Sequence, residues 1–262
     1  RRVFKEVAQL GFKADADTLL ADMEAIPYAI VNEDSEKYRE SVYRARAIVR
    51  ERLRLAMGLS LRPENKPVHL TAGVEASNIS EKYYEPPLMQ VIPSACESCE
   101  ENKYEVSNIC KGCLAHPCQE VCPKDAISMV NGRSYIDQEK CIKCGKCKSV
   151  CPYDAIAKKE RPCQKACGVN AIKSDKMGRA YIDNEKCVSC GMCMVSCPFG
   201  AISDKSQIFQ LARALSEGEN VIAEIAPAFV GQFGDNITPR NIKAALRELG
   251  FSEVYEVALG AD

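Results

Sequence analysis

Sixteen cysteines are the residues of this sequence whose type and spacing could do chemistry. All of them lie between Cys96 and Cys197, in C-x-x-C and C-x-x-x-C spacings. Thiols this closely spaced, in a chain whose N-terminus is no signal peptide, are typical of metal ligands in a reducing compartment, whereas disulfide frameworks belong to small secreted proteins. We therefore expect metal or cluster binding, in the cytoplasm, and not disulfides.

Two runs have the spacing C-x2-C-x2-C-x3-C-P of bacterial ferredoxins, in which three cysteines bind one [4Fe–4S] cluster and the fourth binds its neighbour. Structural zinc, the alternative, favours two distant C-x-x-C pairs. The runs are Cys141, Cys144, Cys147, Cys151 and Pro152, and then Cys187, Cys190, Cys193, Cys197 and Pro198.

A third run, with a longer middle spacer, supplies the crossed ligands for the first of these two runs. It comprises Cys110, Cys113, Cys118, Cys122 and Pro123. Crossed ligation then predicts a first cluster on Cys110, Cys113, Cys118 and Cys151, and a second on Cys141, Cys144, Cys147 and Cys122.

The second module has only half of such a partner run, because "KKERP" stands where a C-x-x-C is expected before Cys163 and Cys167. The third predicted cluster lies on Cys187, Cys190, Cys193 and Cys167, and the fourth on Cys163, Cys197, Cys96 and Cys99. The alternative to the fourth set is a zinc ribbon on Cys96, Cys99, Cys110 and Cys113. The sequence thus predicts four [4Fe–4S] clusters, or three and a zinc site.

An internal repeat carries these cysteines. "GRSYIDQEKCIKCGKCKSVCPYDAI" (132–156) and "GRAYIDNEKCVSCGMCMVSCPFGAI" (178–202) are identical at more than half of their positions. Each unit is expected to be a short strand, a cysteine loop and then a short helix that begins at the Cys-Pro dipeptide. The repeat predicts tandem ferredoxin-like modules.

Cysteine-free segments flank the repeat. Residues 1–80 form an expected helical region, 81–158 a linker and the first two-cluster module, 159–204 the second module, and 205–262 the start of a parallel α/β domain. In that last segment, helices over 206–215 and 239–250 alternate with strands at 220–227 (a buried strand) and 252–259. The fold class is therefore α+β.

One amphipathic helix is expected in the N-terminal region, with Ser35 as its cap and Gly58 just past its end. Its apolar stripe comprises Val42, Ala45, Ile48, Val49, Leu53 and Met57. Five arginines cover the rest, as a solvated face or, alternatively, a docking surface: Arg44, Arg46, Arg50, Arg52 and Arg54.

Charge and hydropathy exclude several partners. The 35 basic and 36 acidic residues nearly cancel, which gives no indication of nucleic-acid binding, and no apolar run is long enough for a membrane span. The first module carries Lys143, Lys146 and Lys148, where the second has Met192 and Met194. We expect the lysines to face an acidic redox partner and the second module to pack against the C-terminal part.

The order of these features resembles the N-terminal two-thirds of a monomeric [FeFe] hydrogenase of the group B kind. The specific part is "IAPAFVGQF" followed by "LRELGFSEVYEVALGAD", which is similar to the opening of the hydrogenase catalytic domain. The resemblance implies an anaerobic enzyme that reduces protons or oxidises H2 at a cysteine-bound H-cluster, with ferredoxin or a similar carrier as partner.

No cysteine follows Cys197, so the H-cluster ligands implied by the resemblance are missing and we predict no catalytic residue here. We expect an electron relay between an external carrier and the remainder of the catalytic domain, without catalysis by this chain alone. The alternative is a freestanding subunit with several [4Fe–4S] clusters in another oxidoreductase complex, which would not need the C-terminal α/β segment.

Overall fold

The computed structural model describes residues 1–13, 17–32, 39–77, 86–234 and 236–260. The chain divides into two compact units: unit 1 is Arg1–Ser94 with Ser203–Asp262, and unit 2 is Ala95–Ile202. The four segments expected from the sequence stay a prediction. In the described part of the chain, no helix combines the length and apolar character that crossing a bilayer requires.

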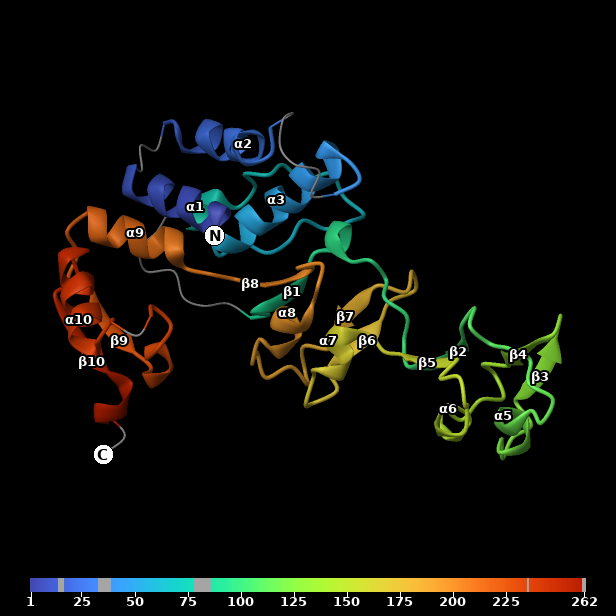
Figure 1. The fold of residues 1–262 in the computed structure, drawn as a ribbon. Coiled ribbons are helices and arrows are strands. Elements are labelled where there is room, and N and C mark those ends of the chain that lie inside the picture. The colour runs from blue at the N-terminus through green and yellow to red at the C-terminus, as the bar shows by residue number, and fades with distance from the viewer. Residues whose placement is uncertain (14–16, 33–38, 78–85, 235, 261–262) are drawn as a thin grey trace. The chain divides into compact units, whose positions relative to one another are not determined.

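Unit 1 is built around packed helices (Figure 1). They are α1 (Arg2–Lys13), α2 (Leu19–Ile30), α3 (Val42–Ala56), the short α4 (Val74–Ser77) and α9 (Ile208–Ser216). Their apolar faces form one core around Met23, Leu53 and Phe209, none of which is exposed. The helical N-terminal region is confirmed, and its core also takes in a helix from the far side of the cysteine-rich segment.

Gly11 lets α1 and α9 approach closely. A Cβ at this position would lie 2.7 Å from Ala212 Cβ and 2.8 Å from Phe209 O. Contacts this short require glycine, because any side chain would have to push the two helices apart. One missing side chain thus sets the spacing between segments far apart in sequence.

Helix α3 begins later than expected. Its N-cap is Ser41, whose hydroxyl accepts the amide N–H of Arg44, and the expected cap Ser35 lies outside the described residues. A serine that accepts an amide of the first turn fixes the helix start, and Ser41 satisfies this role. The predicted stripe is otherwise confirmed, since Ile48, Leu53 and the others from Ala45 onward are buried.

Arg44, Arg46 and Arg54 of α3 donate hydrogen bonds to main-chain carbonyls, and Arg46 and Arg50 lie over the ring of Tyr28. Arg54 is buried and donates to the carbonyls of Ser60, Leu70 and Ala72. Burial lowers the pKa of its guanidinium, although the neighbouring Glu51 acts in the opposite direction. The expectation of a solvated or docking face is therefore wrong for Arg54, which serves as an internal cross-link.

The C-terminal part of unit 1 contains β9 (Ile222–Ile225), η2 (Pro227–Phe229), α10 (Pro239–Glu248), β10 (Glu253–Glu256) and η3 (Val257–Gly260). β9 and β10 pair in parallel, from Ile222 with Glu253 to Ile225 with Glu256. The expected helix and strands are present. β9 is not the buried strand predicted, because Ala223 is its one buried residue. A two-stranded sheet leaves both faces largely uncovered.

Unit 2 consists of short strand pairs and one-turn helices (Figure 1). The antiparallel pairs are β2 (Lys103–Val106) with β5 (Ile156–Lys159), β3 (Ile127–Val130) with β4 (Arg133–Ile136), and β6 (Ile172–Ser174) with β7 (Ala180–Ile182). The helices are α5 (Pro117–Glu120), α6 (Lys146–Ser149), α7 (Pro162–Lys165) and α8 (Met192–Ser196). The short strand predicted in each unit of the repeat is present, as β4 in the first unit and β7 in the second.

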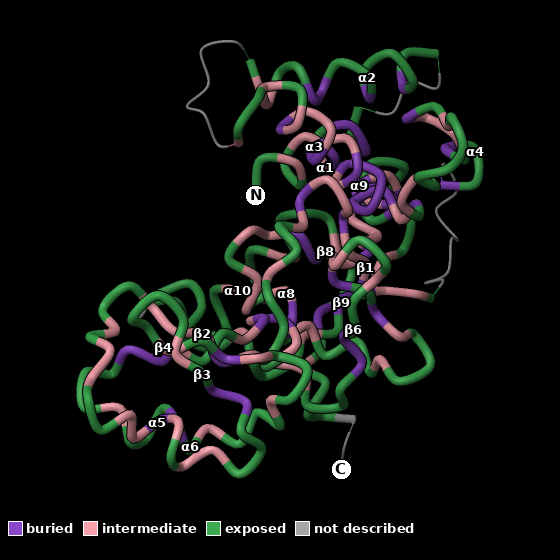
Figure 2. The backbone as a smooth tube through the Cα atoms, turned by 90° about the vertical axis from the view of Figure 1, so that its right-hand side faces the viewer, coloured by how far each residue is buried: buried purple, intermediate pink, exposed green. Residues whose placement is uncertain are grey.

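The element order repeats along the cysteine-rich segment. Helix, hairpin, helix and strand follow one another as α5, β3, β4, α6 and β5, and again as α7, β6, β7, α8 and β8 (Ile202–Asp204). β5 pairs with β2, and β8 pairs with β1 (Met89–Val91), which follows the cis Pro86–Pro87 peptide and precedes η1 (Pro93–Ala95). Figure 2 shows that buried backbone is sparse in β2–β4, α5 and α6. Cysteines therefore form part of the small core there, as Cys118 and Cys147 do beside Ile127, Ile136 and Ile156.

Candidate metal centre

The first C-x-x-C turn of each cysteine run, and the Cys96–Cys99 turn, have the same backbone conformation. The residue just before the second cysteine has a positive φ: 47° at Ser98, 56° at Gly112, 59° at Lys143 and 55° at Ser189. Non-glycine residues rarely adopt this left-handed region, so its recurrence indicates a common constraint. The Cys96–Cys99 turn therefore shares the local geometry of the three ferredoxin-type turns.

Four cysteines occupy the second position of a short helix, and all four are buried: Cys118 in α5, Cys147 in α6, Cys163 in α7 and Cys193 in α8. Such a helix orients its thiol inward at a fixed point after the preceding turn. Cys163 thus matches the other three in position and burial, although no C-x-x-C turn comes directly before it.

The last cysteine of each run accepts an amide N–H from the alanine four residues later, at 3.2–3.3 Å: Ala126 to Cys122, Ala155 to Cys151, Ala171 to Cys167 and Ala201 to Cys197. The residue before each alanine has a positive φ: Asp125, Asp154, Asn170 and Gly200. The expected helix after Cys-Pro is therefore wrong. The left-handed residue breaks any helix, the sulfur takes the amide, and a strand follows.

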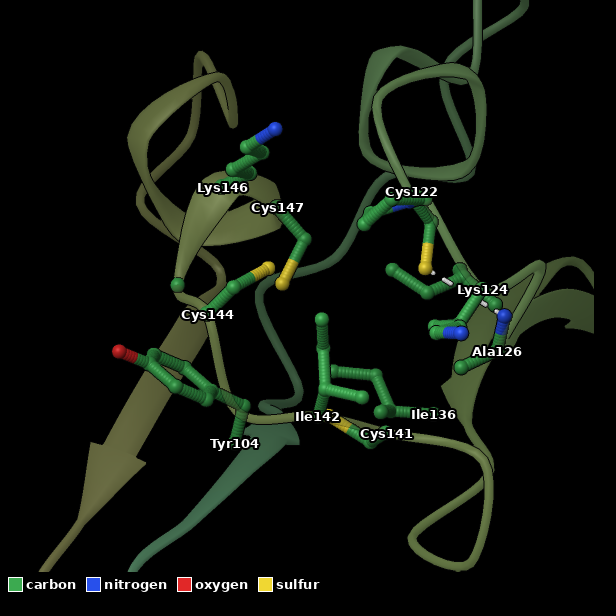
Figure 3. Close-up of a pocket in the computed structure, with 13 residues that line it drawn as sticks. Tyr104, Cys122, Lys124, Ala126, Ile136, Cys141, Ile142, Cys144, Lys146 and Cys147 are labelled. Carbon is green, nitrogen blue, oxygen red and sulfur yellow. Dashed lines mark hydrogen bonds between the residues drawn. The ribbon is translucent and has the colours of Figure 1, made fainter.

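Cys122, Cys141, Cys144 and Cys147 line one pocket, of about 340 Å³ including its open mouth. Figure 3 shows the sulfur atoms of Cys144 and Cys147 facing that of Cys122 across this space, with Lys146 pointing away. Burial raises the pKa of the Cys147 thiol, and the neighbouring Cys141 and Cys144 act in the same direction. The structure thus brings together the four cysteines predicted for the second cluster.

A second pocket, of about 320 Å³, is lined by Cys110, Cys113, Cys118 and Cys151, the set predicted for the first cluster. The Cys118 thiol lies 3.3 Å from the hydroxyl of Ser134. Burial favours the neutral Cys110 thiol, but hydrogen bonds from Ser134 and Gly112 leave its pKa below the usual value. A thiol with lowered pKa is closer to the thiolate that a metal binds.

Cys193 faces two of its predicted partners. Its pKa is raised by burial first, while the amide of Met194 lowers it and the thiols of Cys187 and Cys167 raise it. Cys190, the remaining member of the third set, is exposed. Cys187 and Cys167 therefore lie near enough to Cys193 to affect its pKa.

The fourth set also converges. Burial raises the pKa of the Cys163 thiol to about 11, with Cys197 and Cys96 acting in the same direction. The pKa of Cys99 is raised by burial and then by Cys96 and Cys197. The amide of Ala180, in the second module, donates to the Cys96 sulfur at 3.4 Å. Cys96 and Cys99 thus lie beside Cys163 and Cys197, although the first module separates them in sequence.

The rival zinc set is divided between two places. Cys110 and Cys113 share their pocket with Cys118 and Cys151, whereas Cys99 faces Cys197. Among the residues that the structure describes, no three His, Cys, Asp or Glu side chains lie close enough to hold a single metal ion, and this applies to the zinc set and to the four predicted cluster sets alike. His116, which lies between Cys113 and Cys118, is the N-cap of α5 and has a left-handed backbone.

Arg161 is the neighbour of this set that the sequence analysis missed. It is 3 % exposed and lowers the pKa of Cys99 and Cys163, against the larger effect of burial. The only signal in the sequence was an arginine within "KKERP", at the point where the repeat loses its C-x-x-C.

Comparisons with protein families agree with this site. Residues 110–161 match the LdpA Fe-S cluster-binding domain, and residues 180–203 match the 4Fe-4S binding domain. Residues 219–262 match the C-terminal domain of the iron only hydrogenase large subunit. The donor set of clustered thiols with sulfur-directed amides fits [4Fe–4S] clusters. The chain is thus an iron–sulfur, electron-transfer protein with a hydrogenase-related segment.

Several curated proteins are similar over the cysteine-rich part. An uncharacterized ferredoxin of Methanocaldococcus jannaschii is 33% identical over 99 residues, covering 30% of this chain and 63% of that protein. The electron transport protein HydN of Escherichia coli is 37% identical over 71 residues, covering 27% and 41%. The chain therefore spans less than two thirds of either relative.

A shorter relative is covered more fully. Ferredoxin 7Fe of Hydrogenibacillus schlegelii is 43% identical over 53 residues, which are 20% of this chain and 68% of that protein. This match, together with the repeated cysteine turns, is what a shared ancestry of the domain predicts. Through its cysteine-rich segment, the chain belongs to the ferredoxin family of iron–sulfur proteins.

Proposed function

We propose that this chain is the electron-transfer portion of an [FeFe] hydrogenase, which relays electrons between an external carrier such as ferredoxin and a hydrogen-converting H-cluster. The observation that carries the proposal is the order along one chain: cysteine turns of ferredoxin type are followed directly by a segment that matches the hydrogenase domain. No cysteine follows Cys197, so the residues here serve the relay.

Sixteen thiolates would hold four [4Fe–4S] clusters, in the sets described by the sequence pattern. When bound, such clusters accept and release single electrons at potentials set by charge, hydrogen bonds and exposure. The chain's own residues hold and insulate them: each set has one buried helix cysteine, and the last cysteine of each run accepts an alanine amide. Thiolate ligation requires the reducing conditions of a compartment such as the cytoplasm.

The fourth set is supported by a rearranged module. β1 and the Cys96–Cys99 turn precede the first module, just as β2 and the Cys110–Cys113 turn open it, and β1 pairs with β8 as β2 pairs with β5. We infer that the first module is inserted into the second, after the C-x-x-C turn. This accounts for the missing turn at "KKERP".

The alternative is a freestanding multi-cluster subunit, for which HydN, an electron transport protein, is the favouring relative. Reduction by H2 gas distinguishes the hydrogenase relay from the freestanding subunit. In the complete protein purified without oxygen, H2 should reduce the iron–sulfur sites as fully as dithionite does. Sites that dithionite reduces but H2 leaves oxidised would support the subunit and exclude the hydrogenase relay.

Metal content tests the ligand sets separately. The anaerobically purified protein should contain about sixteen iron atoms and no zinc. Cys163→Ser should lower this to about twelve iron atoms while the other three clusters keep their spectra. About twelve iron atoms and one zinc in the unsubstituted protein would contradict the fourth set and favour the ribbon.

A further inference from the structure

Arg161 reaches the main chain of the Cys96–Cys99 turn from the second module. Its Nε and Nη2 atoms both donate to the carbonyl oxygen of Cys99, at 3.0 and 2.8 Å. The two residues are far apart in sequence. A forked pair of charged hydrogen bonds to one carbonyl fixes both the position and the direction of the turn.

The same guanidinium is anchored on its other side by the β6–β7 hairpin. Nη1 donates to the Ser174 hydroxyl at 2.8 Å, and Nη2 donates to the Gly178 carbonyl at 2.8 Å. Ser174 in turn donates to the carboxylate of Glu101, which lies 4.0 Å from Nη1. Arg161 therefore links the Cys96–Cys99 turn to the body of the second module at two points.

Arg161 precedes α7, where the three other short helices have a left-handed residue. Those residues are His116, Gly145 and Gly191. Gly145 and Gly191 directly follow a C-x-x-C turn, and His116 follows one after two intervening residues. Arg161 instead has an extended backbone, with φ −71° and ψ 118°, because the chain arrives from β5. The missing turn thus coincides with a buried cation at this position.

The charge at this position has an electrostatic consequence. Arg161 is 3 % exposed, so water screens its charge weakly, and its guanidinium donates to the main chain of Cys99, a ligand assigned to the fourth site. The Glu101 carboxylate is about half exposed and lies 4.0 Å from Nη1, so it offsets the charge incompletely. A nearby cation favours the form of a thiolate-bound cluster that holds one more electron.

We propose that Arg161 is a positioning residue that holds the Cys96–Cys99 turn in the second module, and that its buried charge raises the reduction potential of the fourth site. The inference rests on the proposed fourth ligand set. It assigns to one side chain both the attachment of a displaced ligand pair and the tuning of the cluster that this pair completes.

The test uses the complete, anaerobically purified protein with Arg161→Gln and Arg161→Lys. Lys173→Gln is the matched control, because it removes an equal charge from an exposed side chain of the same hairpin. Iron per chain and the potentials of all clusters, from a dithionite titration followed by electron paramagnetic resonance, are measured for each. Arg161→Gln should lower one of four potentials, Arg161→Lys should restore most of the shift, and the control should leave all four unchanged.

Loss of about four iron atoms in Arg161→Gln but not in Arg161→Lys would also support the proposal. It would show that the Cys96–Cys99 turn is no longer held in place when the positive charge is removed. Both variants retaining all iron at unchanged potentials would overturn it. Equal loss of iron from several clusters in Arg161→Gln would also overturn the proposal, because it would indicate a general structural role for Arg161. If Cys163→Ser loses no iron, the fourth ligand set has failed independently of Arg161.

Discussion

At the scale of the residue, one left-handed conformation recurs just before the second cysteine of four C-x-x-C turns. Serine, lysine and glycine all adopt it, at Ser98, Gly112, Lys143 and Ser189. The residue type therefore does not cause the conformation; the need to aim two sulfur atoms at one point does. For a side chain other than glycine, left-handed backbone costs roughly 1–2 kcal/mol.

Ser98 provides the sharpest test of this geometry. Ser98→Val should lose iron from the fourth site and lower stability, because a β-branched side chain adopts a φ of 47° less readily than serine does. Ser98→Gly should retain the iron content. Iron analysis and thermal unfolding are the measurements, with Glu97→Val as the control at the preceding position. Equal behaviour of the two valine variants would contradict the assigned constraint.

At the scale of the element, the helices of unit 1 depend on close approach more than on intrinsic helix preference. Helix α1 carries a glycine in its interior, where alanine would ordinarily be favoured. That glycine faces α9 with no room for a Cβ. Packing between segments distant in sequence has therefore outweighed local propensity.

Gly11→Ala should accordingly destabilise unit 1 by about 1–3 kcal/mol, since the added methyl meets Ala212 and the carbonyl of Phe209. Gln9→Ala, at an exposed position of the same helix, should be nearly neutral. Chemical denaturation followed by circular dichroism compares the two. A stabilised Gly11→Ala protein would show that the helices can separate without cost.

The same elements show which features of the structure can be predicted from the sequence. Periodicity predicted the α3 stripe, and the spacing of cysteines grouped the sulfur atoms, because both follow from local chain geometry. The burial of Arg54 and the α1–α9 contact were missed, since they depend on partners distant in sequence. The helix expected after Cys-Pro was wrong because sulfur, and not a helix carbonyl, takes the alanine amide. The contacts of Arg161 were missed for the same reason as the burial of Arg54, because they too depend on partners distant in sequence.

At the scale of the whole molecule, charge distinguishes the two modules. Lys143, Lys146 and Lys148 are exposed around the second ligand set, where the corresponding spacer of the other module has methionines. Exposed lysines steer an acidic partner at low ionic strength, and salt screens the effect. The first module is therefore our proposed entry point for electrons from an acidic carrier.

Replacing these three lysines by glutamate should slow reduction by an acidic ferredoxin by about tenfold or more at low salt. The rate of reduction by a small neutral donor should be unaffected. High salt should reduce the difference in the rate of reduction by ferredoxin between the variant and the unsubstituted protein. Stopped-flow absorbance measures each rate, and replacement of Lys165, Lys173 and Lys186 in the second module is the control. Equal slowing by both donors would exclude a steering role.

The ends of unit 2 meet at the fourth site, and this has a consequence for the unfolded chain. The unit runs from Ala95 to Ile202, and Cys96 and Cys197 stand near its two ends. A cluster held there would close a loop of roughly 100 residues, whose chain-entropy contribution is about 4–5 kcal/mol in the cross-link model. With the cluster bound, unit 2 is in this sense a closed ring. A single proteolytic cleavage of the main chain within the first module should therefore leave the two fragments attached to each other.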